Sequence, residues 1–325
     1  MSIEKVNQFV QSDLEIVERR LLERAANLYE FVDQAAQHVI KGGGKRLRPI
    51  LTLLSARAAG CSGGAMYDLA AAMELIHIAS LVHDDVIDES PLRRGQETLN
   101  AKFGNKVAVL VGDYMHARVL AVLVACKAGE EVFEAVAEAT QSMCEGEVIH
   151  AYQAREFELK LDEYLQVIEL KTARLMSCSC RIGALLGTAG AKAVEALAAY
   201  GHAVGMAFQI VDDVLDMIGE ESAFGKPTRN DLREGKMTLP AMYFRDNCSP
   251  EERARLRELM LADERSPEEA EWIVQRAEAK GASKYALKVA ADYTEQANEC
   301  LKALPESGAK EALIHLARGL AVRDR

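Results

Sequence analysis

The sequence lacks a cysteine pattern that would assign a covalent or metal framework. It contains seven cysteines, an odd number, and no two of them form a C-x-x-C pair. Even the close pair Cys178 and Cys180 has no partners at ligand spacing, which argues against both a disulfide framework and a zinc site. Free thiols are typical of a reducing compartment, so the sequence predicts a cytoplasmic protein.

An excess of positive charge is also lacking. Lys and Arg number 39 against 50 Asp and Glu, which gives a formal net charge of -11 at pH 7. This balance argues against a nucleic-acid-binding surface and against general electrostatic adhesion to anionic lipid. A ligand that carries phosphate would therefore need a local cluster of basic residues.

Long uninterrupted apolar runs are absent as well. No run approaches the 18 or more residues of a membrane span. The segment 1–14 is charged throughout and does not have the pattern of a signal peptide. The sequence therefore predicts a protein without a transmembrane segment.

Segments that alternate with period two are missing, and apolar residues recur at helical intervals instead. All seven prolines stand at expected helix ends or in loops, and no low-complexity stretch divides the chain. With 49% apolar residues, the sequence predicts a single all-α domain over residues 1–325. Serine caps followed by proline and glutamate predict two helix starts, at Ser249 and Ser266. Helices are expected over 1–40, 45–59, 66–88, 107–127, 130–152, 161–187 and 191–219 and from those two caps to about 322, with a loop of lid length over 219–236.

Among the residues that are present, three aspartates in an apolar helical stretch carry the most information. Asp84, Asp85 and Asp88 fall within one arc of about 100° on a helix, so their carboxylates point the same way. Like charges on an apolar face repel each other unless a cation lies between them, and Mg2+ combines one or two carboxylates with phosphate oxygens. A single motif of this kind is usually a solvated acidic face. Here the neighbours are apolar, and the spacing recurs at Asp212, Asp213 and Asp216.

Several further motifs accompany the two clusters. Taken singly, each has a plain structural explanation, such as a helix C-cap for the glycines or a core position for His77. In their order, and over nearly the whole chain, they resemble the trans-isoprenyl diphosphate synthases, and in detail the bacterial octaprenyl diphosphate synthases. The motifs are Gly42-Gly43-Gly44-Lys45-Arg46-Leu47-Arg48-Pro49, His77, Arg93-Arg94-Gly95, Glu145-Gly146-Glu147, Lys171-Thr172, Phe208-Gln209, Gly235-Lys236-Met237-Thr238-Leu239-Pro240 and the terminal Arg323-Asp324-Arg325.

The resemblance implies a helical bundle of the isoprenoid synthase type with a central substrate cavity, and an enzyme that joins isopentenyl diphosphate to farnesyl diphosphate. Ionisation of the allylic C–O bond leaves a pyrophosphate anion, whose charge Mg2+ would stabilise. By resemblance, about three Mg2+ ions are held by Asp84, Asp85, Asp88, Asp212, Asp213 and Asp216. Catalytic roles fall to Asp84, Asp88, Arg93, Lys171, Asp212 and Lys226, and contacts with the allylic diphosphate to Arg93, Lys171, Thr172, Gln209, Lys226 and Lys236.

Isopentenyl diphosphate must be held without metal, because its diphosphate must not leave. The resemblance implies that the pocket consists of arginines and lysine, which suit phosphate, together with a histidine. The pocket residues are Lys45, Arg48, His77 and Arg94.

Product length is predicted from the turn beneath the first cluster. Ser80 lies one helical turn below Asp84, with Ala79 beside it. Both are small where short-chain relatives carry aromatic residues that close the tunnel. The resemblance therefore implies a deep apolar tunnel and a long product, octaprenyl diphosphate, for the side chain of ubiquinone.

The family implies a homodimer, and alternatives to the main reading remain open. The product could have another chain length. A terpene cyclase or head-to-head condensing enzyme would use similar aspartates without needing Lys45, Arg48 and Arg94. A non-catalytic subunit of a two-component synthase, or a helical interaction protein, would tolerate loss of the aspartates, and none is lost. One residue departs from the family pattern: Arg229 stands close to Lys226 and Asp231, where relatives usually carry glycine.

Overall fold

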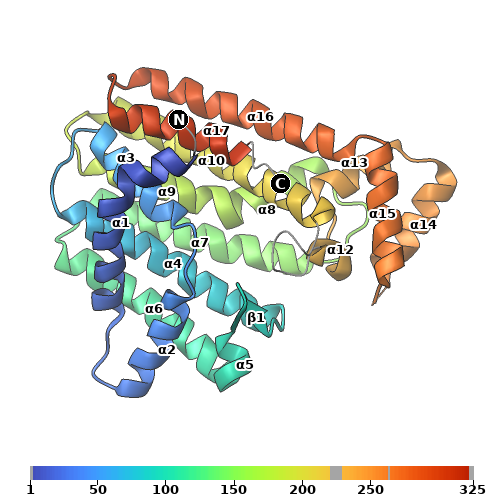
Figure 1. Cartoon of the computed structure of the whole chain (residues 1–325), viewed down its shortest axis with the longest axis horizontal. Helices are drawn as coiled ribbons and strands as arrows, with labels where there is room; N and C mark the ends of the chain where they lie inside the picture. Colours follow the sequence, from blue (N-terminus) through green and yellow to red (C-terminus); the bar gives the residue numbers. More distant parts are fainter. Residues whose placement is uncertain (1–2, 220–228, 263, 322–325) are drawn as a thin grey trace. The chain divides into compact units, whose positions relative to one another are not determined.

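The computed structural model describes residues 3–219, 229–262 and 264–321, and it is helical almost throughout (Figure 1). The first half contains α1 (Ile3–Ala25), α2 (Glu30–Lys41), α3 (Leu47–Ala58), α4 (Ala65–Ile87), β1 (Leu92–Arg93), β2 (Gln96–Glu97), α5 (Leu99–Phe103), α6 (Asn105–Ala125) and α7 (Glu130–Tyr152). The second half contains α8 (Leu161–Ile168), η1 (Glu169–Ala173), α9 (Arg174–Leu185), α10 (Ala191–Ile218), α12 (Asn230–Glu234), α13 (Leu239–Asn247), α14 (Pro250–Leu261), α15 (Pro267–Ala279), α16 (Ala282–Cys300), η2 (Leu301–Ala303) and α17 (Gly308–Ala321).

The all-α prediction is confirmed, and the two predicted caps form as capping boxes. The Ser249 hydroxyl accepts from the Glu252 N–H while the Glu252 carboxylate accepts from the Ser249 N–H, and Ser266 and Glu269 repeat this exchange. Each serine precedes a proline at the first helical position, where the missing N–H has no intrahelical partner to lose.

The prediction of one helix over 1–40 is wrong, because the chain breaks between α1 and α2. The side chain of Asn27 accepts from the N–H of Tyr29, and the N–H of Asn27 donates to Asp33. Such local side-chain bonds give the backbone an alternative to the helix. The helix predicted over 161–187 likewise contains the π-helical turn η1 between α8 and α9.

The chain divides into two compact units, and the first comprises residues 1–140, 175–201 and 300–316. Its central helix is α4, which packs against α1, α3 and α6 (Figure 1). Leu69, Met73 and Ile76 of α4 are fully buried, as expected for a helix that is apolar around its circumference. Because α4 ends at Ile87, the first aspartate cluster lies at its C-terminal end.

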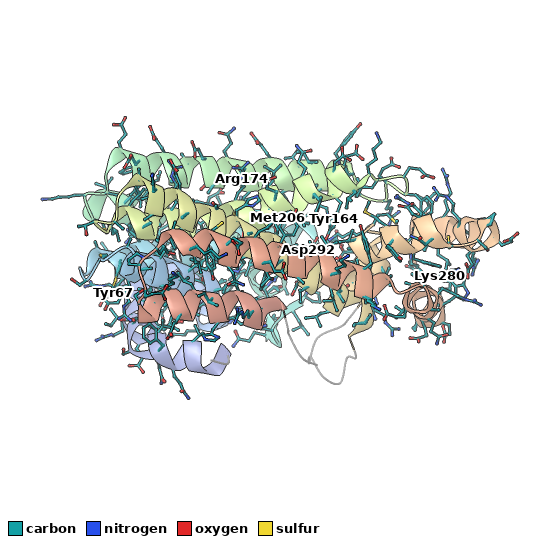
Figure 2. All side chains as sticks on the ribbon, turned by 90° about the horizontal axis from the view of Figure 1, so that it is seen from above. Tyr67, Tyr164, Arg174, Met206, Lys280 and Asp292 are labelled. Atoms are coloured by element: carbon teal, nitrogen blue, oxygen red, sulfur yellow. The ribbon has the colours of Figure 1, made fainter. Side chains whose placement is uncertain are left out.

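The second unit comprises residues 141–174, 202–299 and 317–325 and has an apolar core of its own. Tyr164 of α8 and Met206 of α10 both belong to this core (Figure 2). Phe244 of α13 contacts Trp272 of α15 edge to face, with ring centroids 6.1 Å apart. The prediction of a single domain stays a prediction.

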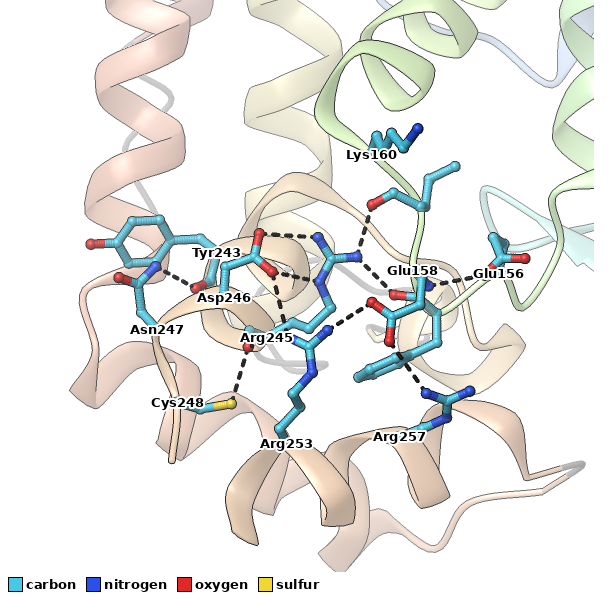
Figure 3. A network of polar contacts seen from close by, with 12 residues as sticks. Glu156, Glu158, Lys160, Tyr243, Arg245, Asp246, Asn247, Cys248, Arg253 and Arg257 are labelled. Carbon is cyan, nitrogen blue, oxygen red and sulfur yellow. Dashed lines mark hydrogen bonds and ion pairs between the residues drawn. The ribbon is translucent and has the colours of Figure 1, made fainter. Parts of the chain in front are cut away.

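A buried arginine fixes the segment that leads into α8 in the second unit. The Arg245 guanidinium donates to the carbonyl oxygens of Phe157 and Leu159 at 2.7 and 2.8 Å, and it pairs with Asp246 at 2.7 Å (Figure 3). Its side chain is only 7% exposed. These bonds satisfy two carbonyl groups in an irregular segment, where no regular helix or sheet supplies hydrogen-bond donors.

Replacing Arg245 by alanine is expected to lower the free energy of unfolding by about 3 kcal/mol, because two buried carbonyls lose a charged donor. Chemical denaturation followed by circular dichroism measures the change. Arg257→Ala is the matched control, since Arg257 also reaches this segment, through Glu158, but is 57% exposed. Its effect should stay within about 0.5 kcal/mol. Equal effects of the two substitutions would contradict the role given to Arg245.

In the part of the chain that the structure describes, three helices, α4, α6 and α10, are long and apolar enough to cross a membrane by length and composition alone. They differ in how much of their apolar stretch is buried inside the protein: 72% for α4, 56% for α10 and 39% for α6. Helix α6 is therefore the least buried of the three.

Candidate functional site

The first aspartate cluster lies where the helix itself disfavours negative charge. Asp84 and Asp85 stand in the last turn of α4, and Asp88 is its C-terminal cap. The carbonyl end of a helix carries partial negative charge, so three carboxylates there need positive partners. Asp85 is buried and accepts a hydrogen bond from Arg93 Nε at 2.7 Å. Burial raises the pKa of Asp85 above its usual value even though Arg93 opposes the shift.

A two-residue hairpin turn brings the predicted arginines to this place. Strands β1 and β2 pair antiparallel, and Arg94 and Gly95 between them have φ of 53° and 75°. Positive φ at both positions is what a type I′ turn requires. While Arg93 reaches Asp85, the Arg94 guanidinium donates to the carbonyl oxygen of Gly43. Gly44 has φ of 147°, a conformation that residues with a side chain rarely adopt, so glycine suits this position beside Arg94.

Arg46, in the predicted basic segment, has a structural role. It is buried, adopts φ of 48° before α3, and pairs with Glu18 at 2.5 Å and Glu74 at 3.0 Å. It also donates to the carbonyl oxygen of Ile40 at 2.9 Å. These bonds fix the backbone between the flanking residues Lys45 and Arg48.

Arg48 and His77, both predicted for the isopentenyl diphosphate pocket, lie together. Arg48 Nη1 is 3.2 Å from His77 Nε2, and because a guanidinium only donates, the histidine accepts with a neutral ring. Burial, together with the charges of Arg48 and Arg94, lowers the pKa of His77 well below its usual value. A cavity of about 50 Å³ is lined by His77, Gly42, Gly43, Asp85, Arg93 and Arg94, among other residues.

The two residues predicted to control product length differ in their surroundings. Ala79 is fully buried. Ser80 is partly buried, and its hydroxyl donates to the carbonyl oxygen of His77 at 2.9 Å. Whether either lines a tunnel stays a prediction.

In the second unit, Asp213 is the centre of a chain of hydrogen bonds. Its two carboxylate oxygens accept from the Tyr164 hydroxyl at 2.6 Å and from Gln209 Nε2 at 2.8 Å. Thr172 Oγ1 donates to Gln209 Oε1 at 2.8 Å, which fixes the orientation of that amide. Burial raises the pKa of Asp213 to about 7, against the hydrogen bonds from Tyr164 and Gln209. The neighbouring Asp212 is exposed.

Asp216 binds the start of α12. Its carboxylate accepts from the backbone N–H groups of Asn230 and Asp231 at 3.2 and 3.0 Å. Burial raises the pKa of Asp216, and it raises the pKa of Asp231 well above the usual value, with Asp213 and Asp216 adding to the latter shift. Arg229 has φ of 66°, a conformation that favours the glycine usual in relatives, and pairs with Glu271 at 2.7 Å.

The predicted lysines have different surroundings. Lys171 stands on η1, and its ammonium contacts Glu147 at 2.5 Å and His150 at 2.9 Å. Lys236 pairs with Glu234. Lys226 lies outside the described residues.

The carboxylate oxygens of the two aspartate clusters suit a hard cation whose remaining ligands are oxygens of substrate and water. Both clusters offer carboxylate oxygens only, and burial that raises the pKa of Asp85, Asp213 and Asp216 makes a nearby cation favourable. Within the described ranges, no three His, Cys, Asp or Glu side chains converge to hold a metal ion unaided. Mg2+ commonly takes one or two carboxylates and completes its shell with phosphate oxygens and water, so the residues fit Mg2+ with a diphosphate.

Sequence reasoning missed four residues that this geometry brings forward. Arg46 and Glu147 were parts of motifs but had no role of their own, and Tyr164 and His150 belonged to no motif. Their partners lie 49, 21 and 28 residues away in the cases of Tyr164, His150 and Arg46. Local spacing carries no signal for contacts of that range.

Comparison with known proteins gives a consistent result. The family model described as polyprenyl synthetase matches residues 29–277. The octaprenyl diphosphate synthase of Escherichia coli (strain K12) is 34% identical over 325 residues, 100% of both chains. Heptaprenyl diphosphate synthase component 2 of Geobacillus stearothermophilus is 36% identical over 324 residues, also 100% of both. The crystal structure of a polyprenyl synthase from Caulobacter crescentus CB15, complexed with calcium and isoprenyl diphosphate, matches with a TM-score of 0.94 at 34% identity and covers 99% of this chain and 98% of that chain.

Proposed function

Because the chain belongs to the polyprenyl synthetase family and is therefore a prenyltransferase, we propose that it adds isopentenyl diphosphate units to farnesyl diphosphate and makes octaprenyl diphosphate. The observation that carries this proposal is the cavity lined by His77, Arg93 and Arg94 directly beside Asp85. Basic donors for one diphosphate there adjoin carboxylates that suit a metal-bound diphosphate.

The carboxylates and cations act on the charge that develops as the allylic C–O bond breaks. Bound Mg2+ would supply positive charge to the departing pyrophosphate, with Asp84, Asp88 and Asp212 holding it and Asp85 and Asp216 in support. The calcium bound in the Caulobacter relative supports a divalent cation in this role. Lys171 and Lys236 add donors for the allylic diphosphate, and the Arg93 contact with Asp85 orients that carboxylate.

The second substrate keeps its diphosphate, so the chain's own donors hold it. Arg48 and Arg94 would bind its oxygens, with Lys45 beside them. His77 is neutral because Arg48 donates to it, and its remaining ring N–H can donate to an oxygen. A pocket without metal does not polarise the C–O bond of isopentenyl diphosphate, which suits a substrate that must not ionise.

The octaprenyl length and the use in ubiquinone are the finer part of the proposal. They are supported by the small residues Ala79 and Ser80 and by the similarity to the Escherichia coli octaprenyl diphosphate synthase. The heptaprenyl relative is 36% identical and the octaprenyl relative 34%, so identity alone favours no single length. That relative is named as component 2, which favours one alternative: a subunit that needs a second protein for activity.

Incubation of the purified protein with farnesyl diphosphate, labelled isopentenyl diphosphate and Mg2+ tests the proposal. Label should pass into a solvent-extractable prenyl product, and chelation of Mg2+ should abolish the transfer. No extractable label from the protein alone would contradict the proposal and favour the subunit of a two-component synthase. A cyclic hydrocarbon would favour a terpene cyclase.

A homodimer is part of the proposal, and the exposed face of α6 supports it. Leu110, Leu120 and Val124 are 57%, 57% and 68% exposed and recur along one face of the helix. An exposed apolar stripe of this length marks an interaction surface, and a second copy of this chain would cover it.

Replacing Leu120 and Val124 together by glutamate is expected to convert the dimer to a monomer, because two charges would be buried without partners. Sedimentation velocity measures the mass. Leu261→Glu is the control, since Leu261 is exposed to 44% but lies on α14, and it should leave the dimer intact. A monomeric wild-type protein would contradict this part of the proposal.

A cytoplasmic location is also proposed. All seven cysteines are free thiols, which suits a reducing compartment.

A further inference from the structure

The turn that carries Lys171 is held closely by its neighbours. It is a single π-helical turn, η1, of the kind that is rare and often found at functional sites. A Cβ atom on Gly146 of α7 would lie 2.8 Å from Leu170 Cβ and 3.0 Å from the backbone nitrogen of Lys171. A Cβ atom on Gly205 of α10 would lie 2.5 Å from Ala173 Cα. The two glycines let α7 and α10 approach η1, so the backbone of Lys171 has little room to move.

Two side chains of α7, one turn apart, hold the ammonium of Lys171. Glu147 Oε2 lies 2.5 Å from Lys171 Nζ, and His150 Nδ1 lies 2.9 Å from it. Because an ammonium only donates, His150 accepts with this nitrogen. The Lys171 and Glu147 side chains keep 26% and 25% of their surface exposed, so an anion in solution can reach the pair.

Glu147 stays charged in this setting. Burial disfavours its ionised form, but the Lys171 ammonium opposes that effect, and the pKa of Glu147 lies below its usual value. The negatively charged Glu147 carboxylate therefore contacts the Lys171 ammonium, which the proposed function assigns to the allylic diphosphate. A diphosphate that binds Lys171 would lie close to the Glu147 carboxylate. The two negative charges would repel each other strongly, because the site is partly buried.

We propose that Glu147 is a positioning residue that holds the Lys171 ammonium while the diphosphate site is empty and weakens the binding of pyrophosphate, so that pyrophosphate leaves after each addition. The inference rests on the proposed function, because only repeated additions require repeated release. An ammonium has three N–H groups, and Glu147 and His150 take two of them. The third can donate to an incoming phosphate oxygen before the ion pair opens.

The test is the affinity for pyrophosphate, measured by calorimetric titration of the full-length protein in the presence of Mg2+. Glu147→Gln should lower the Kd about tenfold, because the neutral amide removes the repulsion. Glu145→Gln is the matched control: it removes the same charge from the same helix, but Glu145 is exposed and bonds to Gln141. Its Kd should stay within about twofold of wild type.

Steady-state kinetics separates this role from a purely structural one. Glu147→Gln should lower both kcat and the KM for farnesyl diphosphate, since product release slows, and Glu147→Asp should restore both in part. A structural defect would instead raise KM and weaken pyrophosphate binding.

Unchanged or weaker pyrophosphate affinity in Glu147→Gln overturns the inference while the proposed function stands. A wild-type protein that binds no pyrophosphate with Mg2+ overturns both.

Discussion

Replacing Asp84 by asparagine is expected to lower kcat for prenyl transfer about 1000-fold, equivalent to ~4 kcal/mol of transition-state stabilisation. The amide keeps the shape of the side chain but loses the charge that would hold Mg2+ on the departing pyrophosphate. Asp212→Asn, in the second cluster, should have a loss of similar size. Initial rates with saturating farnesyl and isopentenyl diphosphates measure both.

The control for these substitutions is Glu89→Gln. Glu89 follows the first cluster directly, is exposed, and has no assigned role. The substitution therefore removes one negative charge close to the cluster without changing a proposed metal ligand. Its rate should stay within about twofold of wild type, and circular dichroism should show all variants folded. A loss of less than tenfold in Asp84→Asn would be incompatible with a metal-holding role for that residue.

Replacing Ala79 by tyrosine is expected to shorten the products to a few prenyl units. Ala79 lies between one and two turns below Asp84 on α4, so a large ring there would stop a growing chain close to the reacting carbon. Chromatography of the dephosphorylated products gives the distribution of lengths.

Because Ala79 is fully buried, a tyrosine there could overpack the core and prevent folding. A second variant therefore tests the same prediction at a less buried position. Ser80→Phe places a ring on the adjacent, partly buried position and should shorten the products as well. Thermal unfolding reports whether each variant is folded. Full-length products from both folded variants would show that no prenyl chain passes this turn.

The helices were predictable where local chemistry determines them. The serine caps at Ser249 and Ser266 form as their sequences require, and α4 extends to the first aspartate cluster as its apolar pattern predicts. The break at Asn27 was not predictable from periodicity, because the apolar residues on either side continue the helical spacing. The π turn around Lys171 was missed for the same reason, since one added residue hardly changes the pattern.

The sequence named candidate site residues but did not indicate which of them contact one another. The motifs assigned His77 and Arg94 to the isopentenyl diphosphate pocket and Arg93 to the allylic diphosphate, whereas in the structure all three line one cavity. They did not predict that Arg93 would pair with Asp85, or that Tyr164 would donate to Asp213 across 49 residues. Those contacts depend on tertiary packing, which the spacing of residues within one helix does not encode.

Mass spectrometry of the dephosphorylated product tests the central claim most directly. The purified protein alone, with farnesyl diphosphate, excess isopentenyl diphosphate and Mg2+, should make linear products. After dephosphorylation, octaprenol should be the most abundant alcohol. No elongated alcohol, or one that appears only when a second protein is added, would contradict the account.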